Sequence, residues 1–323
     1  RQVWVRGDDI KLRRWLDGLP VDLMSSKPLL CIFHAWSLFA TGRQGMAERC
    51  LQVAEQTLEP STGRAAEDAP MEQERLPGAG GMKLRGRAAA TRAYFCFYRG
   101  DVPGLSHYSR QALEYLPEQD LAWRCAATNV LGDAHDFKGE MAAAYQVRLE
   151  ALKTCKAAGN NYQVMIANLK LAVNLRHLGR LQRVIEICQQ QLQLAHERGM
   201  SQTVVVGWLL AIWGEALAEL NDLDGAVEQA RKGVELTERG GEMAMLGWSY
   251  QCLTRVLFAR GELTGAKEII QKMESTAREY DVPPWITNLM AAWQARIWLA
   301  EDKLDAVAQW AQERGLNIAG DLT

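Results

Sequence analysis

The sequence has little of what several functional classes require. Its 323 residues include only five histidines and seven cysteines, and no Cys-x-x-Cys pair occurs, so zinc and dithiol redox sites lose their usual sequence support. The longest run without a charged residue has 16 positions, between Arg198 and Glu215, whereas a membrane-spanning helix needs roughly 20. Basic and acidic residues nearly balance, at 37 against 39, which argues against direct nucleic-acid contact and against a membrane partner.

Catalytic and targeting signatures are also missing. The chain has no Gly-Lys-Ser or Gly-Lys-Thr, no Gly-x-Ser-x-Gly and no two histidines four residues apart, so nucleotide, hydrolase and helical zinc motifs are absent. Residues 1–14 alternate charged and apolar positions and lack the apolar core of a secretory signal. We therefore expect a cytoplasmic binding protein with reduced cysteines, no metal site and no catalytic function.

A short turn recurs along the chain and divides it into similar units. Its central residue is glycine, asparagine or aspartate, which tolerate the left-handed conformation at a helix end. Successive turns are 58, 39, 40, 42, 40 and 41 residues apart, and this periodicity is typical of helical repeat proteins. The seven turn residues are Gly42, Gly100, Gly139, Gly179, Asn221, Gly261 and Asp302.

Small side chains stand at fixed distances from the turns. Seven residues before each turn the sequence has Ala, Gly or Thr: Ala35, Ala93, Gly132, Ala172, Gly214, Thr254 and Ala295. Five residues after each turn comes a small or medium apolar residue: Ala47, Leu105, Ala144, Val184, Ala226, Ala266 and Val307. Such positions let two helices cross closely, so each unit is predicted to be a helical hairpin. We predict an all-α, tetratricopeptide-like superhelix of about seven repeats of roughly 40 residues.

The first spacing exceeds the normal unit by about 19 residues. The excess falls at residues 60–82, a stretch rich in proline, glycine and charge, for which we predict a mobile surface loop. Apart from this loop, we predict a single helical-repeat domain over residues 1–323.

The first helix of each hairpin in such a superhelix lines a concave groove suited to peptides or small molecules. Counting back 13, 10, 6, 3 and 2 residues from each turn selects the side chains expected to face it. Our candidate binding residues are Asn129, Asp133, Arg176, His177, Trp208, Glu215, Trp248, Gln251, Arg255 and Arg296, and the same count also selects Trp36, Arg87, Tyr94 and Asp136. Aromatic planes with arginines and amides suit sugar-like, nucleotide-like or peptide ligands. Since tryptophans also pack between repeats, the polar members are the stronger candidates.

Two local clusters have both a chemical and a structural interpretation. Residues 133–136 combine carboxylates with His135, as a metal site would, but solvated residues at a helix end give the same pattern. Glu215 and Glu219 lie four residues apart and would suit acid–base chemistry only in a pocket that excludes water. We interpret this pair as part of a solvent-exposed helical face.

Both ends of the chain carry motifs of a known family. The segment from Leu12 to Leu58 contains a Trp-Leu-x-x-Leu-Pro motif at Trp15 and a Pro-x-Leu helix start at Pro28, and a Trp-Ala-x-x-x-Gly-Leu motif begins at Trp310. These segments resemble the helical repeat region of MalT-like activators, which are large LuxR-type, ATP-dependent transcription regulators. The resemblance runs from near Leu12 to the end of the chain.

The resemblance implies a sensor region within a multidomain regulator. Family members also carry a nucleotide-binding switch domain and a DNA-binding helix-turn-helix, neither of which occurs in this sequence, so we expect the chain to be the sensor region alone. ATP is then expected only for the missing switch domain, and this region should need no cofactor. It should bind a small-molecule effector or a regulatory protein in its groove and couple this binding to activation.

A passive scaffold is the alternative to an effector-sensing region. A tetratricopeptide groove also serves as a passive scaffold that docks a partner protein or a second copy of the chain, with no small molecule involved. Replacement of Arg176 or Arg255 by alanine would separate the two, since loss of a metabolite response with assembly intact indicates sensing.

Overall fold

The structure is a computed structural model that describes residues 9–58 and 79–316. Every regular element within these two ranges is a helix, as predicted. The helices are α2 (Asp9–Asp17), α3 (Val21–Ser26), α4 (Pro28–Ala40), α5 (Gln44–Leu58), α6 (Ala79–Arg99), α7 (Val102–Tyr115), α8 (Leu121–Phe137), α9 (Met141–Ala157), α10 (Asn161–His177), α11 (Leu181–Glu197), α12 (Val204–Glu219), α13 (Leu223–Gly240), α14 (Met243–Arg260), α15 (Leu263–Glu279), α16 (Pro284–Ala300) and α17 (Leu304–Glu313).

The seven recurring turns join the two helices of each hairpin. All seven predicted turn residues have a positive φ, from 58° at Asp302 to 83° at Gly261. The residue after each turn donates its amide to a carbonyl five residues earlier, as Arg180 does to Leu175 at 2.9 Å. This hydrogen bond satisfies a carbonyl that the helix end would otherwise leave unpaired. The turn pattern read from the sequence is therefore confirmed.

Close helix crossings explain the small residues around each turn. The side chains seven before and five after the turns are buried throughout the stack, except that Val307 is only partly buried in the terminal helix α17. The tightest crossing joins α12 to α13, where a Cβ added to Gly233 would lie 2.5 Å from the carbonyl oxygen of Gly207. Backbone lies against backbone there, so no side chain can move aside.

Replacing Gly233 by alanine should lower the free energy of unfolding by about 1–3 kcal/mol, because the new methyl group forces α12 and α13 apart. The matched control is Gly45→Ala in α5, where an added Cβ has no neighbour within 4 Å. That control should not destabilise the fold, since alanine is the better helix former. Urea unfolding of both variants checks the prediction, which equal midpoints for the two would contradict.

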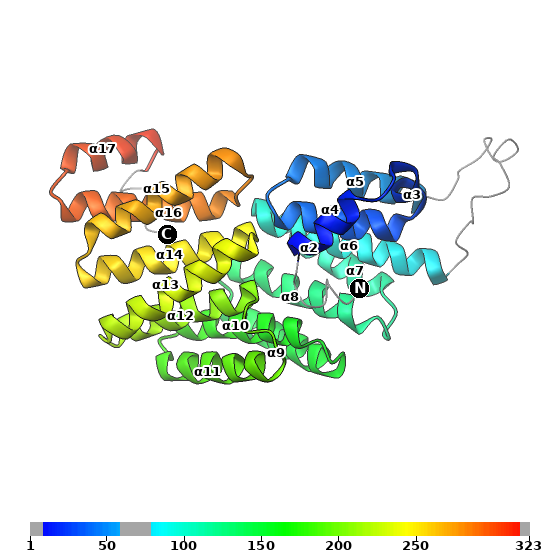
Figure 1. Cartoon of the computed structure of the whole chain (residues 1–323), viewed down its shortest axis with the longest axis horizontal. Coiled ribbons are helices and arrows are strands. Elements are labelled where there is room, and N and C mark those ends of the chain that lie inside the picture. Colours follow the sequence, from blue (N-terminus) through cyan, green and yellow to red (C-terminus); the bar gives the residue numbers. More distant parts are fainter. Residues whose placement is uncertain (1–8, 59–78, 317–323) are drawn as a thin grey trace, which may run out of the picture.

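The superhelix curls until its two ends meet. Figure 1 shows helices α2–α5 and helices α15–α17 on the same side of the molecule, opposite α9 and α11. The amide of Asp281, between α15 and α16, donates to the carbonyl of Gly42 at 3.2 Å, and the Asp281 carboxylate accepts from the Gln44 amide at 3.0 Å. A Cβ on Gly42 would approach the Cβ of Tyr280 to 2.7 Å. One hydrophobic core accordingly contains residues of the first hairpin and of the last ones.

The predicted loop at 60–82 is only partly within the described residues. Residues 60–78 lie outside them, and residues 79–82 form the first turn of α6 rather than part of a loop. None of the described helices is both long and apolar enough to span a bilayer.

Candidate functional site

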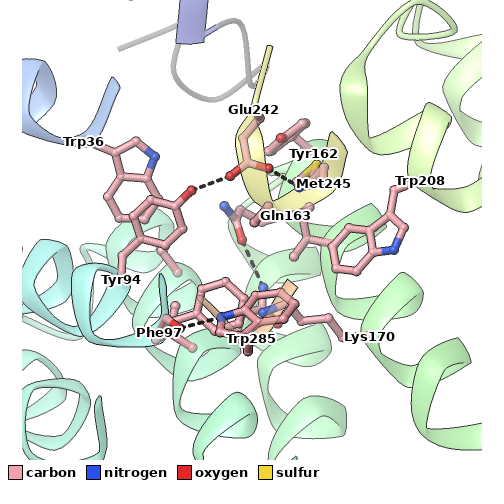
Figure 2. Close-up of a pocket in the computed structure, with 15 residues that line it drawn as sticks. Trp36, Tyr94, Phe97, Tyr162, Gln163, Lys170, Trp208, Glu242, Met245 and Trp285 are labelled. Carbon is pink, nitrogen blue, oxygen red and sulfur yellow. Dashed lines mark hydrogen bonds between the residues drawn. The ribbon is translucent and has the colours of Figure 1, made fainter. Parts of the chain in front are cut away.

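A pocket lies inside the curve of the superhelix. It encloses about 750 Å³ including its open mouth, and its lining comes from the first helix of all seven hairpins, α4, α6, α8, α10, α12, α14 and α16, together with Glu242 just before α14. Most of this volume belongs to the open mouth, since the space that water-sized molecules can occupy is about 80 Å³. At the pocket, α6 contacts Glu242, just before α14, and Trp285 of α16, so residues from near both ends of the chain meet in its walls (Figure 2).

Six of the fifteen residues that line the pocket are aromatic. Trp36 and Tyr94 stack face to face with their ring centroids 4.3 Å apart. Trp285 lies 5.5 Å from Phe97 and donates its indole N–H to the Phe97 carbonyl at 3.2 Å. Trp208 forms the opposite side (Figure 2). Such walls bury flat apolar surface and fix its orientation.

Glu242 carries the main polar contact between the two ends of the chain. Its side chain is buried, and it accepts hydrogen bonds from the hydroxyl groups of Tyr94, at 2.8 Å, and Tyr98. It also accepts from the amide of Met245 at 2.6 Å and so caps α14. The Tyr98 hydroxyl in turn accepts from the Ala244 amide at 3.1 Å. Burial raises the pKa of Glu242, because a buried carboxylate loses its hydration.

A buried ionic network lies behind Lys170 of the pocket wall. Lys170 forms an ion pair with Asp133, and its ammonium lies 5.0 Å from the Phe97 ring centroid. Arg148 from α9 is 1% exposed; it binds Asp133 at 3.0 Å and also binds Asp136. Burial lowers the pKa of Lys170, although the Asp133 carboxylate opposes this shift. The carboxylates of the 133–136 cluster are therefore engaged by cations of the chain itself, and the interpretation of the cluster as solvated residues at a helix end is wrong for the buried Asp133.

Asn129 of the pocket lining has one buried polar atom without a partner. Its amide nitrogen donates to Gln163 at 2.9 Å, while its carbonyl oxygen is buried without a hydrogen-bond partner. Asn129 is 2% exposed. A buried acceptor without a donor is unfavourable, but this oxygen has almost no accessible surface, so a molecule in the pocket does not reach it in this conformation.

The structure distributes the ten sequence-predicted site residues over several places. Asn129 and Trp208 line the pocket, Asp133 lies behind Lys170, and Trp248 contacts Trp208 edge to face at 6.1 Å. The others lie outside the pocket lining: Arg176, His177, Glu215, Gln251, Arg255 and Arg296.

Three of these six form a separate ionic cluster. Glu215 is 1% exposed and pairs with Arg176 at 3.3 Å and with Arg255 at 3.4 Å, and Arg255 also pairs with Glu219. His177 lies beside Arg176, and burial followed by the Arg176 charge lowers its pKa. The interpretation of Glu215 and Glu219 as an exposed pair is wrong for Glu215, because the arginines of α10 and α14 cover it.

The last two of the six lie apart from that cluster. Gln251 is buried within α14, and Arg296 is exposed on α16 with its guanidinium 4.5 Å from the ring centroid of Trp293.

Several pocket residues were missed by the counting rule. Tyr162 and Gln163, Met245 and Trp285 lie 16 or 17 residues before their turns, one helical turn further than the rule reached. Extending the 3.6-residue period once more towards the helix start would have selected them. No periodicity points to Glu242, since it precedes α14.

Residues 86–320 match the family model described as the MalT-like TPR region. The chain belongs to this family. The match covers more than half of the chain and includes α8 to α16, which build most of the pocket.

Relatives of this MalT-like region are transcription regulators. The chain is 27% identical over 311 residues to the HTH-type transcriptional regulator MalT of Yersinia enterocolitica, covering 94% of this chain and 32% of that protein. A MalT of Yersinia pestis gives the same identity and coverage. The chain thus spans about a third of the length of these relatives and corresponds to the repeat region of such a regulator.

Solved structures share the fold of the MalT-like region. A Rap protein complexed with Competence and Sporulation Factor superimposes with a TM-score of 0.65 at 14% identity, covering 98% of this chain and 87% of that one. A signal transduction ATPase with a tetratricopeptide repeat sensor, from Pyrococcus horikoshii, gives 0.54 at 14% identity over 94% and 45%. Both confirm the helical repeat fold.

Proposed function

We propose that this chain is the effector-sensing region of a bacterial transcription activator and that its effector binds in the concave pocket. A small-molecule inducer or a short segment of a regulatory protein would fill the pocket and change how the region contacts the rest of the regulator. The region itself would neither catalyse a reaction nor contact DNA, and it would act in the cytoplasm. ATP would bind elsewhere in the full-length regulator.

The observation that carries this proposal is the composition of the pocket wall. Trp36 and Tyr94 come from the first two hairpins, and Met245 and Trp285 come from the last two. A molecule that touches both groups has a different affinity for the closed ring than for an opened one. Binding must therefore shift the equilibrium between these two shapes.

Two comparisons support the proposal. The matched family is the repeat region of transcription regulators, and repeat regions bind ligands on the concave face that the pocket occupies here. The similar Rap protein is described as a complex with Competence and Sporulation Factor, so a regulatory partner is retained as one class of effector.

The test compares how candidate ligands change the melting temperature of the wild-type chain and of a variant whose pocket is filled by a larger side chain. Thermal melting of the chain is measured against sugars, amino acids, nucleotides, neutral heterocycles and short peptides, because a ligand of the folded state raises Tm by mass action. Gln163→Trp places a large ring at the pocket, and Gln189→Trp on the exposed face of α11 is the matched control. We expect a ligand that raises Tm for the wild type and the control but not for the filled variant.

A pocket that does not respond to any ligand would favour the alternative function, a passive scaffold that docks a partner protein. If no compound raises Tm, or if the filled variant responds like the wild type, the pocket is not an effector site. Retained self-association or partner binding in Gln163→Trp would then assign the region to protein docking. Loss of a response in Arg176→Ala or Arg255→Ala with the pocket intact would place the effector at the ionic cluster on α10, α12 and α14 instead.

A further inference from the structure

A second hollow lies outside the concave pocket, where the two ends of the superhelix meet. One side of this seam hollow is formed by residues 42–49, at the α4–α5 turn and the start of α5, and the other by residues 277–281, at the end of α15. Water-sized molecules can occupy about 390 Å³ of it, compared with about 80 Å³ of the concave pocket. The seam hollow therefore has room for a small molecule without any change in the fold.

Three arginines line the seam hollow, and they come from both of its sides. Arg43 and Arg49 belong to the first hairpin, whereas Arg278 lies in the last turn of α15. All three are exposed, and none forms an ion pair with a carboxylate of residues 9–58 or 79–316. One unpaired arginine is ordinary on a protein surface. Three at the same hollow repel one another, and this repulsion acts across the contact between the two ends.

Two carboxylates line the same hollow, and both already have partners in the chain. Asp281 accepts a hydrogen bond from the Gln44 amide at 3.0 Å. Glu279 accepts one from the hydroxyl group of Tyr280, and this bond raises the pKa of the hydroxyl. The lining thus carries three positive charges against two negative ones. Because the guanidinium groups are the charges without a counter-ion, the hollow favours a negatively charged ligand.

Guanidinium groups select a particular kind of anion. Each presents several N–H donors in one plane, and the oxygens of a phosphate group accept such donors in pairs. The guanidinium of Arg43 lies 4.9 Å from the ring centroid of Tyr280, so its position is already restricted before a ligand binds. A phosphate group has enough oxygens and charge to contact arginines on both sides of the hollow, whereas a chloride ion has no such oxygens.

We propose that the seam hollow binds a phosphate-bearing small molecule, whose phosphate oxygens accept hydrogen bonds from Arg49 and Arg278 and thereby connect the two ends of the superhelix. This site is separate from the concave pocket and does not depend on the function proposed for that pocket. A bound phosphate replaces the repulsion among the arginines by attraction, so the closed ring binds it more tightly than an opened one. The ligand therefore stabilises the closed form.

Pyrophosphate is the probe, because it carries two adjacent phosphate groups and nothing else. Isothermal titration in about 0.15 M salt, where long-range attraction is largely screened, should show saturable binding to the wild-type chain. Arg49→Ala and Arg278→Ala should each weaken this binding about tenfold, the effect of losing one hydrogen-bonded contact to a charged group. The matched control is Arg110→Ala on α7, where the arginine is also exposed but lies outside the hollow. The control should bind pyrophosphate as the wild type does.

The two arginine variants also show whether the anion connects the ends of the chain. Pyrophosphate should raise Tm of the wild type by mass action, and it should raise Tm much less in Arg49→Ala and in Arg278→Ala. Both side chains are exposed and unpaired, so neither variant should lose its fold. Failure of pyrophosphate to bind the wild type would overturn the proposal. Weakening in only one of the two variants would place the anion on one side of the hollow and would overturn it as well.

The filled variant Gln163→Trp separates the seam hollow from the concave pocket. Its new side chain lies at the pocket, so it should bind pyrophosphate as the wild type does. Loss of pyrophosphate binding in this variant, with normal binding in Arg49→Ala, would place the anion in the pocket and overturn the inference.

A phosphate ligand can carry a sugar or a nucleoside, and two further probes distinguish these sources. Glucose 6-phosphate and adenosine diphosphate are titrated in the same way as pyrophosphate. Whichever of the two binds more tightly should lose affinity in both Arg49→Ala and Arg278→Ala. Undiminished affinity of that ligand for both variants would overturn the assignment of its phosphate to the seam hollow.

Discussion

Replacing Arg148 by alanine should lower the free energy of unfolding by about 3–5 kcal/mol, the range for breaking a buried ion pair from one side. Arg148 is 1% exposed, and it bonds to Asn174 at 2.9 Å as well as to Asp133 and Asp136. Its removal leaves Asp133 with Lys170 as its remaining cation and leaves a void between α8, α9 and α10. Because Lys170 lines the pocket, the loss should also weaken ligand binding.

Chemical denaturation followed by circular dichroism measures this effect. The matched control is Arg183→Ala on α11, where the arginine is exposed and pairs with Glu186 three residues away. Exposed pairs of this kind contribute well below about 1 kcal/mol. A loss of similar size in both variants would contradict the importance of the buried network.

Replacing Glu242 by alanine should open the ring and destabilise the fold by about 2–3 kcal/mol. The change removes one acceptor of the Tyr94 and Tyr98 hydroxyl groups and the cap of α14, and leaves Tyr98 with the Ala40 carbonyl at 3.3 Å. Small-angle X-ray scattering should show a larger radius of gyration. The control is Glu262→Ala at the start of α15, where the side chain is partly exposed and makes no cap.

The same residue should make stability depend on pH. Because the pKa of Glu242 is raised in the folded state, the unfolded chain loses this proton first as the pH rises above about 4.3. This part of the stability is complete below the unfolded value and is lost as the pH rises through the folded pKa. Glu242→Gln should remove that decline. An unchanged pH profile and radius of gyration in the variants would show that Glu242 does not hold the ends together.

The hairpins could be predicted because each is specified locally. Gly132 shows the limit of such a prediction: its small size was apparent from the sequence, but its neighbour was not. A Cβ there would lie 3.2 Å from the Arg148 side chain, so the glycine also makes room for the buried arginine. A position that lets two helices approach and one that accommodates a charged side chain look alike in a sequence.

The pocket was only partly predictable, for a different reason. Asn129 and Trp208 follow from counting back along single helices, because the groove face repeats with the helical period. Contact between Tyr98 and Glu242 joins residues 144 positions apart and depends on the summed curvature of the three intervening hairpins, α8–α9, α10–α11 and α12–α13. Small changes in the crossing angle of each hairpin decide whether the two ends meet. The sequence pattern of a single hairpin does not reveal this accumulated curvature.

Closure of the superhelix changes how the repeats communicate. In an open stack each hairpin contacts only its neighbours. A change in the packing angle between two hairpins then displaces the free end of the stack. Here Gly42 and Asp281 join the first hairpin to the last ones, so neither end of the superhelix can move independently. A change at one hairpin must therefore either be distributed as small changes of crossing angle over all hairpins or break the contact between the two ends. The second outcome gives two distinct states of the chain, closed and open, rather than a gradual change of shape.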